Sequence, residues 1–207
     1  MTKIKIIRHS ERLDFKHPFY WLLCFGYHWS DSPLTQTGHV MAKTKGELLT
    51  KNDFYPKNIY VSPYNRTMET ATEIKYSFPN CEIIIEPLLA EYQPYYKHCI
   101  SLYPNGIPTE YAGTATKYKY PENYEEFSSR IKFIISQLMN KNNEDFIVIT
   151  HGEILKVFIN YFQTIYPDIL LDCEKISYLT TLTFEYDDDK NIIKNSITID
   201  HFNQFNS

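Results

Sequence analysis

Cysteine is scarce in this sequence, and its spacing excludes two kinds of protein. The 207 residues include four cysteines with no CxxC pair among them: Cys24, Cys81, Cys99 and Cys173. Neither a zinc module nor a disulfide framework is therefore indicated, and we expect reduced thiols in a cytoplasmic protein. The histidines show no HExxH spacing, so we expect no metal site and no cofactor.

Long apolar runs and an excess of positive charge are also missing. The segment FYWLLCF at residues 19–25 is far shorter than the roughly 20 residues that span a bilayer, and we interpret it as aromatic loop or core material. The formal charge of −4 and the pI near 6.0 give no overall attraction to nucleic acid or to an acidic membrane. We expect neither as a partner. We expect no signal peptide either, because KIKII near the N-terminus already has the pattern of a strand.

Patterns of strands and helices alternate along the chain. Its 207 residues, 43% of them apolar, are enough for one globular domain, residues 1–207. Short runs rich in Ile and Val predict buried strands at 3–7, 58–62, 82–86 and 145–150. Apolar residues at helical spacing predict helices through 127–138 and 154–162. Two more helices are expected, over 65–77 and after Thr35, the latter carrying the apolar residues Val40, Met41, Leu48 and Leu49. This order predicts a three-layer α/β/α fold with a mostly parallel central sheet.

Two segments do not follow this alternation. Residues 179–200 have the pattern of two strands joined by an acidic turn, which predicts a hairpin. Residues 92–123 are rich in Tyr, Pro and Gly without a clear period. A segment of that length is typical of an active-site cover.

The predicted strands end in residues that are suited to chemistry. Ligands of open α/β sheets bind beyond the carboxyl ends of the strands. At those ends the sequence places two histidines, two arginines and a carboxylate: Arg8, His9, Arg66, Glu91 and His151. Because these residues follow four different strands, we expect them to meet at one edge of the sheet.

Arginine is rare, which gives weight to the positions where it occurs. Only four of the 21 basic residues are arginine, and three of those four, Arg8, Arg12 and Arg66, fall in the strand-end segments. A guanidinium matches phosphate oxygens with a planar fork of donors, which an ammonium cannot do. Ordinary ion pairs with Glu11 or Glu69 are the alternative, but the two accompanying histidines favour a phosphoryl ligand.

Four motifs, in order along the chain, resemble those of the histidine phosphatase superfamily. RHSER at 8–12 is similar to its RHG motif, and PLTQTG at 33–38 to its L-T-x-x-G helix start. VSPYNRTMETA at 61–71 is similar to its S-P-x-x-R-x-x-x-T-A segment, and VITHGE at 148–153 to its second-histidine strand. The resemblance covers most of the chain and implies a phosphoglycerate mutase-like fold.

Two segments further resemble the suppressor-of-T-cell-receptor-signalling (ubiquitin-associated and SH3 domain-containing) phosphatases of that superfamily. RHSERLDF at 8–15 is similar to their RHGERxDxxF, and IEPLLAEY at 85–92 to their E-P-G-L-x-E-W. The resemblance implies that Glu91, rather than Glu86, is the general acid. The sequence departs from the family at Ser10, where glycine is usual, but retains Gly152 after the second histidine. Serine fits at position 10 only if its φ is negative, and its hydroxyl could then donate to a phosphate.

These residues predict a phosphomonoester hydrolase that uses no metal. A neutral His9 imidazole, fixed in one tautomer, is the expected nucleophile and would form a phosphohistidine. Arg8, Arg66 and His151 would surround the phosphoryl oxygens.

Two features in the first 30 residues have two interpretations each. Arg12 either gives the phosphate another donor or pairs with Asp14. The aromatic segment at 17–29 either forms a satellite hydrophobic cluster or lines a pocket for phosphotyrosine or another aryl phosphate.

Two other functions remain open at this point. A mutase would form the same phosphohistidine and pass the group back to a sugar acid, although Arg12 and Asp14 disfavour it. A noncatalytic module would bind a phosphorylated ligand, with turnover disabled by Ser10. A phosphorylated small molecule or a phosphoprotein is the expected partner in each case.

Overall fold

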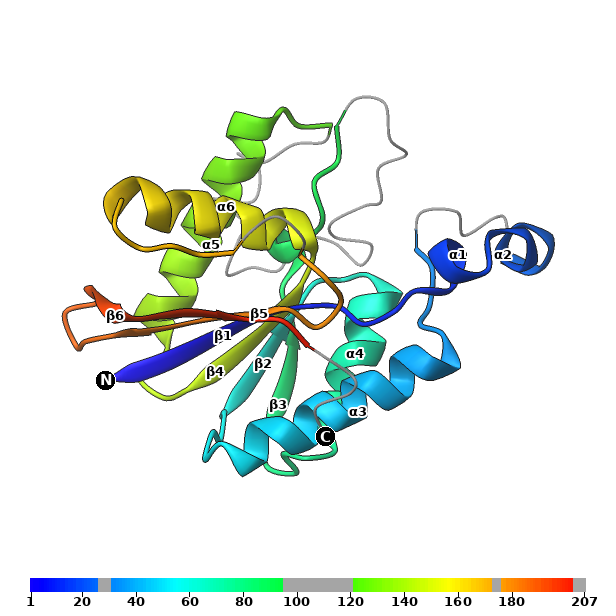
Figure 1. Ribbon diagram of the computed structural model, residues 1–207, viewed down its shortest axis with the longest axis horizontal. Coiled ribbons are helices and arrows are strands. Elements are labelled where there is room, and N and C mark those ends of the chain that lie inside the picture. The colour runs from blue at the N-terminus through cyan, green and yellow to red at the C-terminus, as the bar shows by residue number, and fades with distance from the viewer. Residues whose placement is uncertain (26–30, 95–120, 173–175, 203–207) are drawn as a thin grey trace.

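A six-stranded sheet forms the centre of the molecule, with the strand order β3-β2-β4-β1-β5-β6 (Figure 1). This computed structural model describes residues 1–25, 31–94, 121–172 and 176–202. The strands are β1 (Thr2–Arg8), β2 (Asn58–Val61), β3 (Glu82–Ile85), β4 (Phe146–Thr150), β5 (Thr181–Tyr186) and β6 (Ile192–Asp200). The first four run parallel, and β5 and β6 form an antiparallel pair beside β1. The predicted α/β class, the mostly parallel sheet and the C-terminal hairpin are confirmed.

Four long helices cover the two faces of this sheet. Helices α5 (Tyr124–Lys141) and α6 (Gly152–Ile165) lie on one face, and α3 (Gln36–Lys51) and α4 (Asn65–Lys75) on the other (Figure 1). Side chains cap two of them: Thr35 accepts from the backbone N–H of Gly38 at the start of α3, and Asn123 and Glu126 form a capping box at the start of α5. Three short helices follow β1 and β3: α1 (Leu13–Lys16), α2 (Pro18–Phe25) and η2 (Pro87–Leu89).

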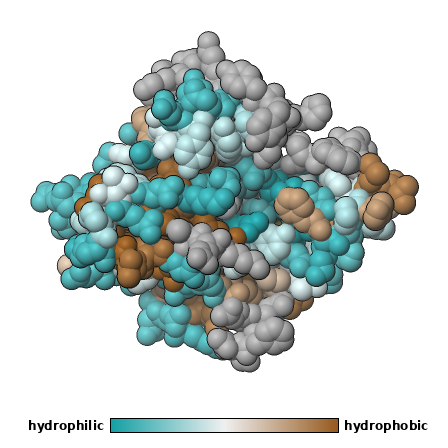
Figure 2. Space-filling model, turned by 45° about the horizontal axis from the view of Figure 1, so that its top comes forward, coloured by the Kyte–Doolittle hydropathy of each residue, from teal (hydrophilic) through white to brown (hydrophobic). Residues whose placement is uncertain are grey.

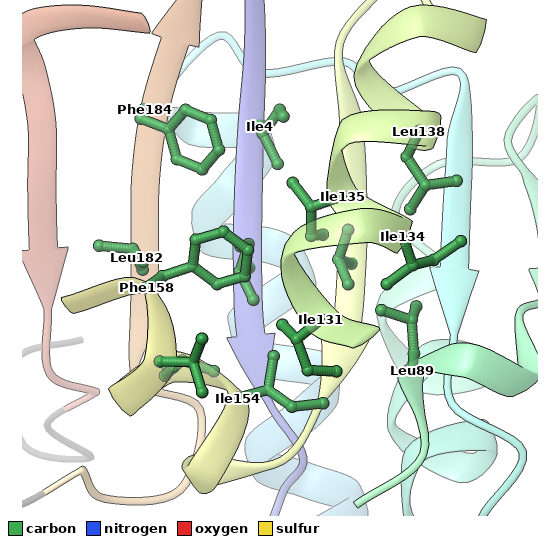
Figure 3. Close-up of a cluster of buried hydrophobic side chains, with 14 of the residues drawn as sticks. Ile4, Leu89, Ile131, Ile134, Ile135, Leu138, Ile154, Phe158, Leu182 and Phe184 are labelled. Carbon is green, nitrogen blue, oxygen red and sulfur yellow. The ribbon is translucent and has the colours of Figure 1, made fainter. Parts of the chain in front are cut away.

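Each face of the sheet has its own hydrophobic core, because successive strand residues point to opposite sides. In Figure 3, side chains of α5 and α6 meet those of β1 and β5, among them Ile4, Ile131, Ile135, Ile154, Phe158, Leu182 and Phe184. The second core lies under α3 and α4 and includes Ile7, Leu49, Ile59, Ile74 and Ile149. Strand β4 is buried along its whole length, as expected for a central parallel strand. The ends of β1 and β4 are therefore held rigidly from both sides.

The aromatic segment after β1 is neither loop nor core, contrary to our prediction. Residues 18–25 form α2, and of residues 18–24 Trp21 alone is buried. Phe19 is 82% exposed and Leu23 is 85% exposed, so the predicted satellite cluster does not form in this part of the segment. Figure 2 shows hydrophobic side chains on the surface at the end of the molecule that carries α2. No helix in the described ranges is both long enough and apolar enough to cross a bilayer.

Two further sequence predictions need correction. Strand β3 was expected to be buried, but it is an edge strand, and its Ile85 is 53% exposed. Val40 points to solvent, and the buried side of α3 includes Ala42 and Lys45 instead. Hydrophobicity alone does not say which side of an element meets the core. The predicted cover at 92–123 falls mostly on residues 95–120, which lie outside the described residues.

Gly38 lets α3 approach the loop that follows β1. A Cβ at this position would lie only 2.4 Å from the backbone oxygen of Glu11. The same loop is held by hydrogen bonds from the Thr35 N–H to the Glu11 carbonyl (3.0 Å) and from the Leu13 N–H to the Pro33 carbonyl (2.9 Å). The PLTQTG segment thus fixes the loop that begins with His9.

Gly38→Ala should therefore lower the free energy of unfolding by about 1–3 kcal/mol, the usual cost of forcing an extra methyl into a packed site. Gly152→Ala is the matched control, because its Cβ would lie 3.5 Å from Arg8 Nε, an ordinary contact. Urea unfolding of both variants measures the difference. Equal stability of the two variants would contradict the role assigned to Gly38.

Candidate active site

The carboxyl ends of β1 and β4 place two histidines side by side. Arg8 and Thr150 are partners in the parallel register, and the N–H of His9 donates to the Thr150 carbonyl at 2.8 Å. His151 follows Thr150 directly, and the centroids of the two imidazole rings are 5.5 Å apart. Both side chains are buried, with 2% of His9 and none of His151 exposed. Residues from distant parts of the sequence thus share one site, as the strand-end pattern predicts.

A backbone carbonyl orients the ring of His9. Its Nδ1 lies 2.8 Å from the carbonyl oxygen of Ser10, which can only accept, so Nδ1 carries the proton in this bond. In the neutral imidazole the lone pair then lies on Nε2, for which the described residues provide no hydrogen-bond partner. This is the tautomer that a histidine nucleophile requires.

His151 is held on both of its ring nitrogens. Its Nε2 is 2.8 Å from Ser62 Oγ, and its Nδ1 is 3.3 Å from Nη2 of Arg66. Because a guanidinium can only donate, Nδ1 accepts and Nε2–H donates to Ser62. The ring of Tyr64 packs edge-on against the imidazole, with 5.0 Å between ring centroids. His151 therefore has a fixed orientation beside His9.

The pKa of each imidazole is well below its ordinary value of 6.5. Burial is the main cause of the lowered pKa in both cases. For His9 the next contributions come from the charges of Arg66 and Arg8, and for His151 from those of Arg66 and His9. Both rings are consequently neutral at pH 7. A neutral His9 has the lone pair that an attack on phosphorus needs.

Acidification should destabilise the fold through these two rings. The unfolded chain binds protons at both imidazoles below about pH 6.5, whereas the folded chain does so only at much lower pH. Stability is therefore lost as the pH falls, by about 1 kcal/mol for each histidine between pH 6.5 and 5.5. Urea unfolding at the two pH values measures this loss. The double variant His9→Gln/His151→Gln should show a smaller loss, and an identical loss would contradict this assignment.

Arg66 joins the histidines to the candidate acid. It lies in the first turn of α4, is fully buried, and donates from Nη2 to Glu91 Oε2 at 2.6 Å. Its guanidinium carbon lies 4.2 Å from the centroid of the Tyr64 ring, a cation–π contact. Asp31 Oδ1 is 3.9 Å from its Nη1. Two carboxylates and one aromatic ring thus orient the guanidinium towards the histidines.

Arg8 is the last residue of β1, and its side chain lies beside Gly152, the first residue of α6. Its Nη1 donates to the carbonyl of Ile176, and its guanidinium carbon lies 4.6 Å from the centroid of the Tyr178 ring. Tyr178 also faces His9, with 5.9 Å between the ring centroids. A Cβ at Gly152 would make ordinary van der Waals contacts with Arg8 Nε, Cδ and Cζ, at 3.5 to 3.8 Å.

The acidic alternatives are engaged elsewhere. Glu86 is 1% exposed, and its side chain accepts from the N–H of Leu88 at the start of η2. Glu11 accepts from the Thr35 hydroxyl at 2.8 Å, and Glu69 accepts from the N–H of Leu34 at 2.6 Å. The ordinary ion pairs considered for Arg8 and Arg66 are therefore not formed, and Glu11 does not partner an arginine. Glu91 is the carboxylate that faces the site.

Ser10 fits the loop through its backbone and its hydroxyl. Positive φ occurs at three non-glycine residues of the described chain, and Ser10 is not one of them, so the condition for a serine is met. Its N–H donates to Thr70 Oγ1 at 3.0 Å, and its hydroxyl donates to the carbonyl of Gly38 at 2.7 Å. The hydroxyl therefore ties the loop to α3, and this geometry does not support the expected bond to a phosphate.

Arg12 pairs with Asp14, which is one of the two interpretations of its sequence position. It is 8% exposed, its Nε donates to Asp14 Oδ1 at 2.6 Å, and its Nη2 donates to Asp14 Oδ2. Its guanidinium carbon also lies 4.3 Å from the centroid of the Phe15 ring. Its charge still helps to lower the pKa of His9 and of His151, which places it near both. Nη1 has no partner among the described residues, so one edge of the fork remains available to an anion.

Sequence reasoning missed four residues that shape this site: Asp31, Ser62, Tyr64 and Tyr178. Ser62 and Tyr64 belong to the SPYNR segment, which directly follows a predicted strand, and this position could have identified them as residues of the site. Tyr178 had no such signal. It reaches the site through a turn in which Leu179 has a φ of 58°, a conformation that nothing in the local composition predicts.

The described residues offer no group of three or more His, Cys, Asp or Glu side chains that could hold a metal ion. The side chains that meet at the site are instead two neutral imidazoles, three guanidinium groups and the carboxylates of Glu91 and Asp31. Donors of this kind and number suit a ligand with several anionic oxygens.

Comparisons with known proteins agree with this description. The family model of the histidine phosphatase superfamily (branch 1) matches residues 6–197. A phosphoglycerate mutase family protein of Acanthamoeba polyphaga mimivirus is 57% identical over 204 residues, which are 98% of this chain and all of that protein. The chain is also similar in structure to the ecdysone phosphate phosphatase of Bombyx mori, solved with tungstate (TM-score 0.66, 20% identity, 93% of this chain and 92% of that one). A phosphoglycerate mutase of Bacillus anthracis is a comparable match (TM-score 0.65, 17% identity, 94% and 92%).

Proposed function

Because the chain belongs to the histidine phosphatase superfamily, branch 1, we propose that it is a metal-independent phosphomonoester hydrolase that acts through a phosphohistidine. The observation that carries the proposal is the buried, neutral His9, whose Nδ1 is bound to the Ser10 carbonyl so that Nε2 keeps the lone pair. The solved structures compared above include both a phosphatase and a mutase, so the fold alone does not choose between these reactions.

The first step transfers the phosphoryl group to the enzyme. Nε2 of His9 attacks phosphorus, and the bond from phosphorus to the ester oxygen breaks with its electron pair going to that oxygen. Glu91 gives its proton to the departing oxygen, a contribution typically worth about 10²- to 10⁴-fold in rate. Arg8 and Arg66 stabilise the charge on the phosphoryl oxygens, with Nη1 of Arg12 as a further donor. His151 joins them when its Nε2–H exchanges the Ser62 hydroxyl for a phosphoryl oxygen.

The second step restores the enzyme. Glu91 takes a proton from a water molecule as the water oxygen attacks the phosphorus of the phosphohistidine. The N–P bond then breaks, and its electron pair returns to Nε2 of His9. Since Arg66 contacts both His151 and Glu91, the same guanidinium serves both steps.

An aryl phosphate is the substrate class that we propose, and phosphotyrosine is one member of it. Tyr178 packs against His9 and is partly exposed, and such a ring can stack on an aromatic leaving group. The RHSERLDF and IEPLLAEY segments, which resemble the suppressor-of-T-cell-receptor-signalling phosphatases, support the same choice. The physiological partner would be a phosphorylated small molecule or a phosphoprotein in the cytoplasm.

Turnover of 4-nitrophenyl phosphate in excess chelator tests the proposal against its two alternatives. We expect release of inorganic phosphate at a rate that chelator does not change, and no increase in transfer when 3-phosphoglycerate is added as an acceptor. Preferred transfer to 3-phosphoglycerate would favour a mutase. Phosphate binding without turnover would favour a noncatalytic module, although the backbone at Ser10 is unstrained and gives no reason for lost activity.

A further inference from the structure

A fully buried arginine of α5 lies outside the site described above. Arg130 has no exposed surface, and Glu122, which is 2% exposed, pairs with it through two hydrogen bonds: Nε to Oε2 at 2.9 Å and Nη2 to Oε1 at 2.5 Å. Burying two charges together costs several kcal/mol of desolvation for each ion. Replacement of such a pair by apolar side chains often leaves stability unchanged or raises it. Stability alone therefore does not explain why the pair is there.

The third nitrogen of Arg130 binds the backbone that leads into Glu91. Nη1 donates to the carbonyl of Leu88 at 2.5 Å and to the carbonyl of Ala90 at 3.1 Å. Ala90 is the residue directly before Glu91. The guanidinium of Arg130 thus fixes the backbone that carries the candidate acid.

The Arg130–Glu122 pair also reaches the backbone on the other side of Glu91. The N–H of Glu122 donates to the carbonyl of Gln93 at 3.0 Å, and the N–H of Gln93 points back to Glu122 Oε1 at 3.4 Å. One buried ion pair therefore contacts the chain both before and after Glu91.

A hydrogen bond and a ring contact strengthen the same attachment. Thr150, the residue before His151, donates its hydroxyl to the carbonyl of Leu89 at 3.0 Å. Tyr92 packs on Phe127 of α5, with 5.1 Å between the ring centroids. The segment that carries Glu91 is thus fixed both to α5 and to the strand end that carries the second histidine.

We infer that Arg130 is a positioning residue for Glu91, holding the acid where it can protonate the leaving group. The inference rests on the proposed function of the site. Arg130 does not touch the reacting atoms; it acts through the backbone of Leu88 and Ala90. An acid displaced by even a fraction of an ångström loses its alignment with the departing oxygen. Removing the attachment should therefore slow the first step only for substrates whose leaving group needs a proton, whereas any effect on the second step is the same for all substrates.

The test compares phenyl phosphate, whose phenolate is strongly basic, with 4-nitrophenyl phosphate, whose phenolate leaves readily without a proton. In the double variant Arg130→Met/Glu122→Met, kcat/KM for phenyl phosphate, which reports the transfer to His9 and not the later attack of water, should fall about 10-fold or more. The value for 4-nitrophenyl phosphate should change by less than about 3-fold. Glu91→Gln should show the same selective loss with a larger magnitude. Arg130→Lys, which keeps the charge but loses the fork, should lie between the wild type and the double variant.

Leu138→Ala is the matched control, because it leaves a cavity in the same helix about two turns beyond Arg130. We expect it to change both substrates equally, and urea unfolding identifies conditions in which every variant is folded. An equal loss on both substrates in the Arg130 variants, or no loss at all, would overturn the inference. A wild-type protein that hydrolyses neither substrate would instead refute the proposed function.

Discussion

His9→Ala should reduce the turnover of 4-nitrophenyl phosphate by at least about 10³-fold, because it removes the atom that forms the covalent intermediate. No neighbouring group can replace it: the described residues place one other imidazole at the site, and both nitrogens of His151 are occupied. The variant should still fold, since the loop after β1 is held by the backbone bonds of Glu11 and Leu13 to the segment before α3. Steady-state kinetics together with urea unfolding separate loss of chemistry from loss of structure.

Added imidazole provides the internal control for this variant. The small cavity left by the ring lies beside Arg66 and Arg8, two of the three arginines whose charge lowers the pKa of His9. Free imidazole should therefore restore part of the activity of His9→Ala, and it should not restore any in Arg66→Ala. Turnover by His9→Ala within about 10-fold of the wild type would show that His9 is not the nucleophile.

Arg66→Lys should lower kcat/KM by about 10²- to 10³-fold, the usual cost of losing one fixed donor to a charged transition state. Lysine keeps the charge, but its single ammonium cannot contact a phosphoryl oxygen, Glu91 and His151 together, as the guanidinium fork can. The loss should appear in kcat as well as in KM, because Arg66 also orients the acid. Steady-state kinetics with 4-nitrophenyl phosphate measure both values.

Arg12→Lys is the comparison for that variant. Two of the three nitrogens of Arg12 bind Asp14, so a single nitrogen remains for the substrate. We expect a smaller loss than for Arg66→Lys, and mainly in KM. Similar losses for the two variants would contradict the central place of Arg66.

Much of the fold could be predicted because its signals are local. The Ile- and Val-rich runs that end at His9 and His151 give the two central strands to within one residue at most ends. The apolar stripe through 127–138 marks α5, although the helix begins earlier, at Tyr124. Strand ends in an α/β sheet then bring Arg8, His9 and His151 together without further information.

The remaining features depend on tertiary contacts that leave no local pattern. The sequence contains Arg130 as one of its four arginines, but its partners Glu122, Leu88 and Ala90 come from other parts of the chain. Tyr178 reaches the site through a turn with an unusual φ at Leu179. The aromatic segment that includes α2 was expected to form loop or core material, yet it forms a helix in which Phe19 and Tyr20 are exposed.

The most direct test of the phosphohistidine is to locate the phosphoryl group on the protein during turnover. The reaction with 4-nitrophenyl phosphate is stopped in alkali, the protein is digested, and the peptides are sequenced by mass spectrometry. We predict one added phosphoryl group on the peptide that contains His9, at the imidazole, and its loss on treatment with acid. Turnover with the group on another residue, or with no phosphoenzyme formed at all, would contradict the mechanism.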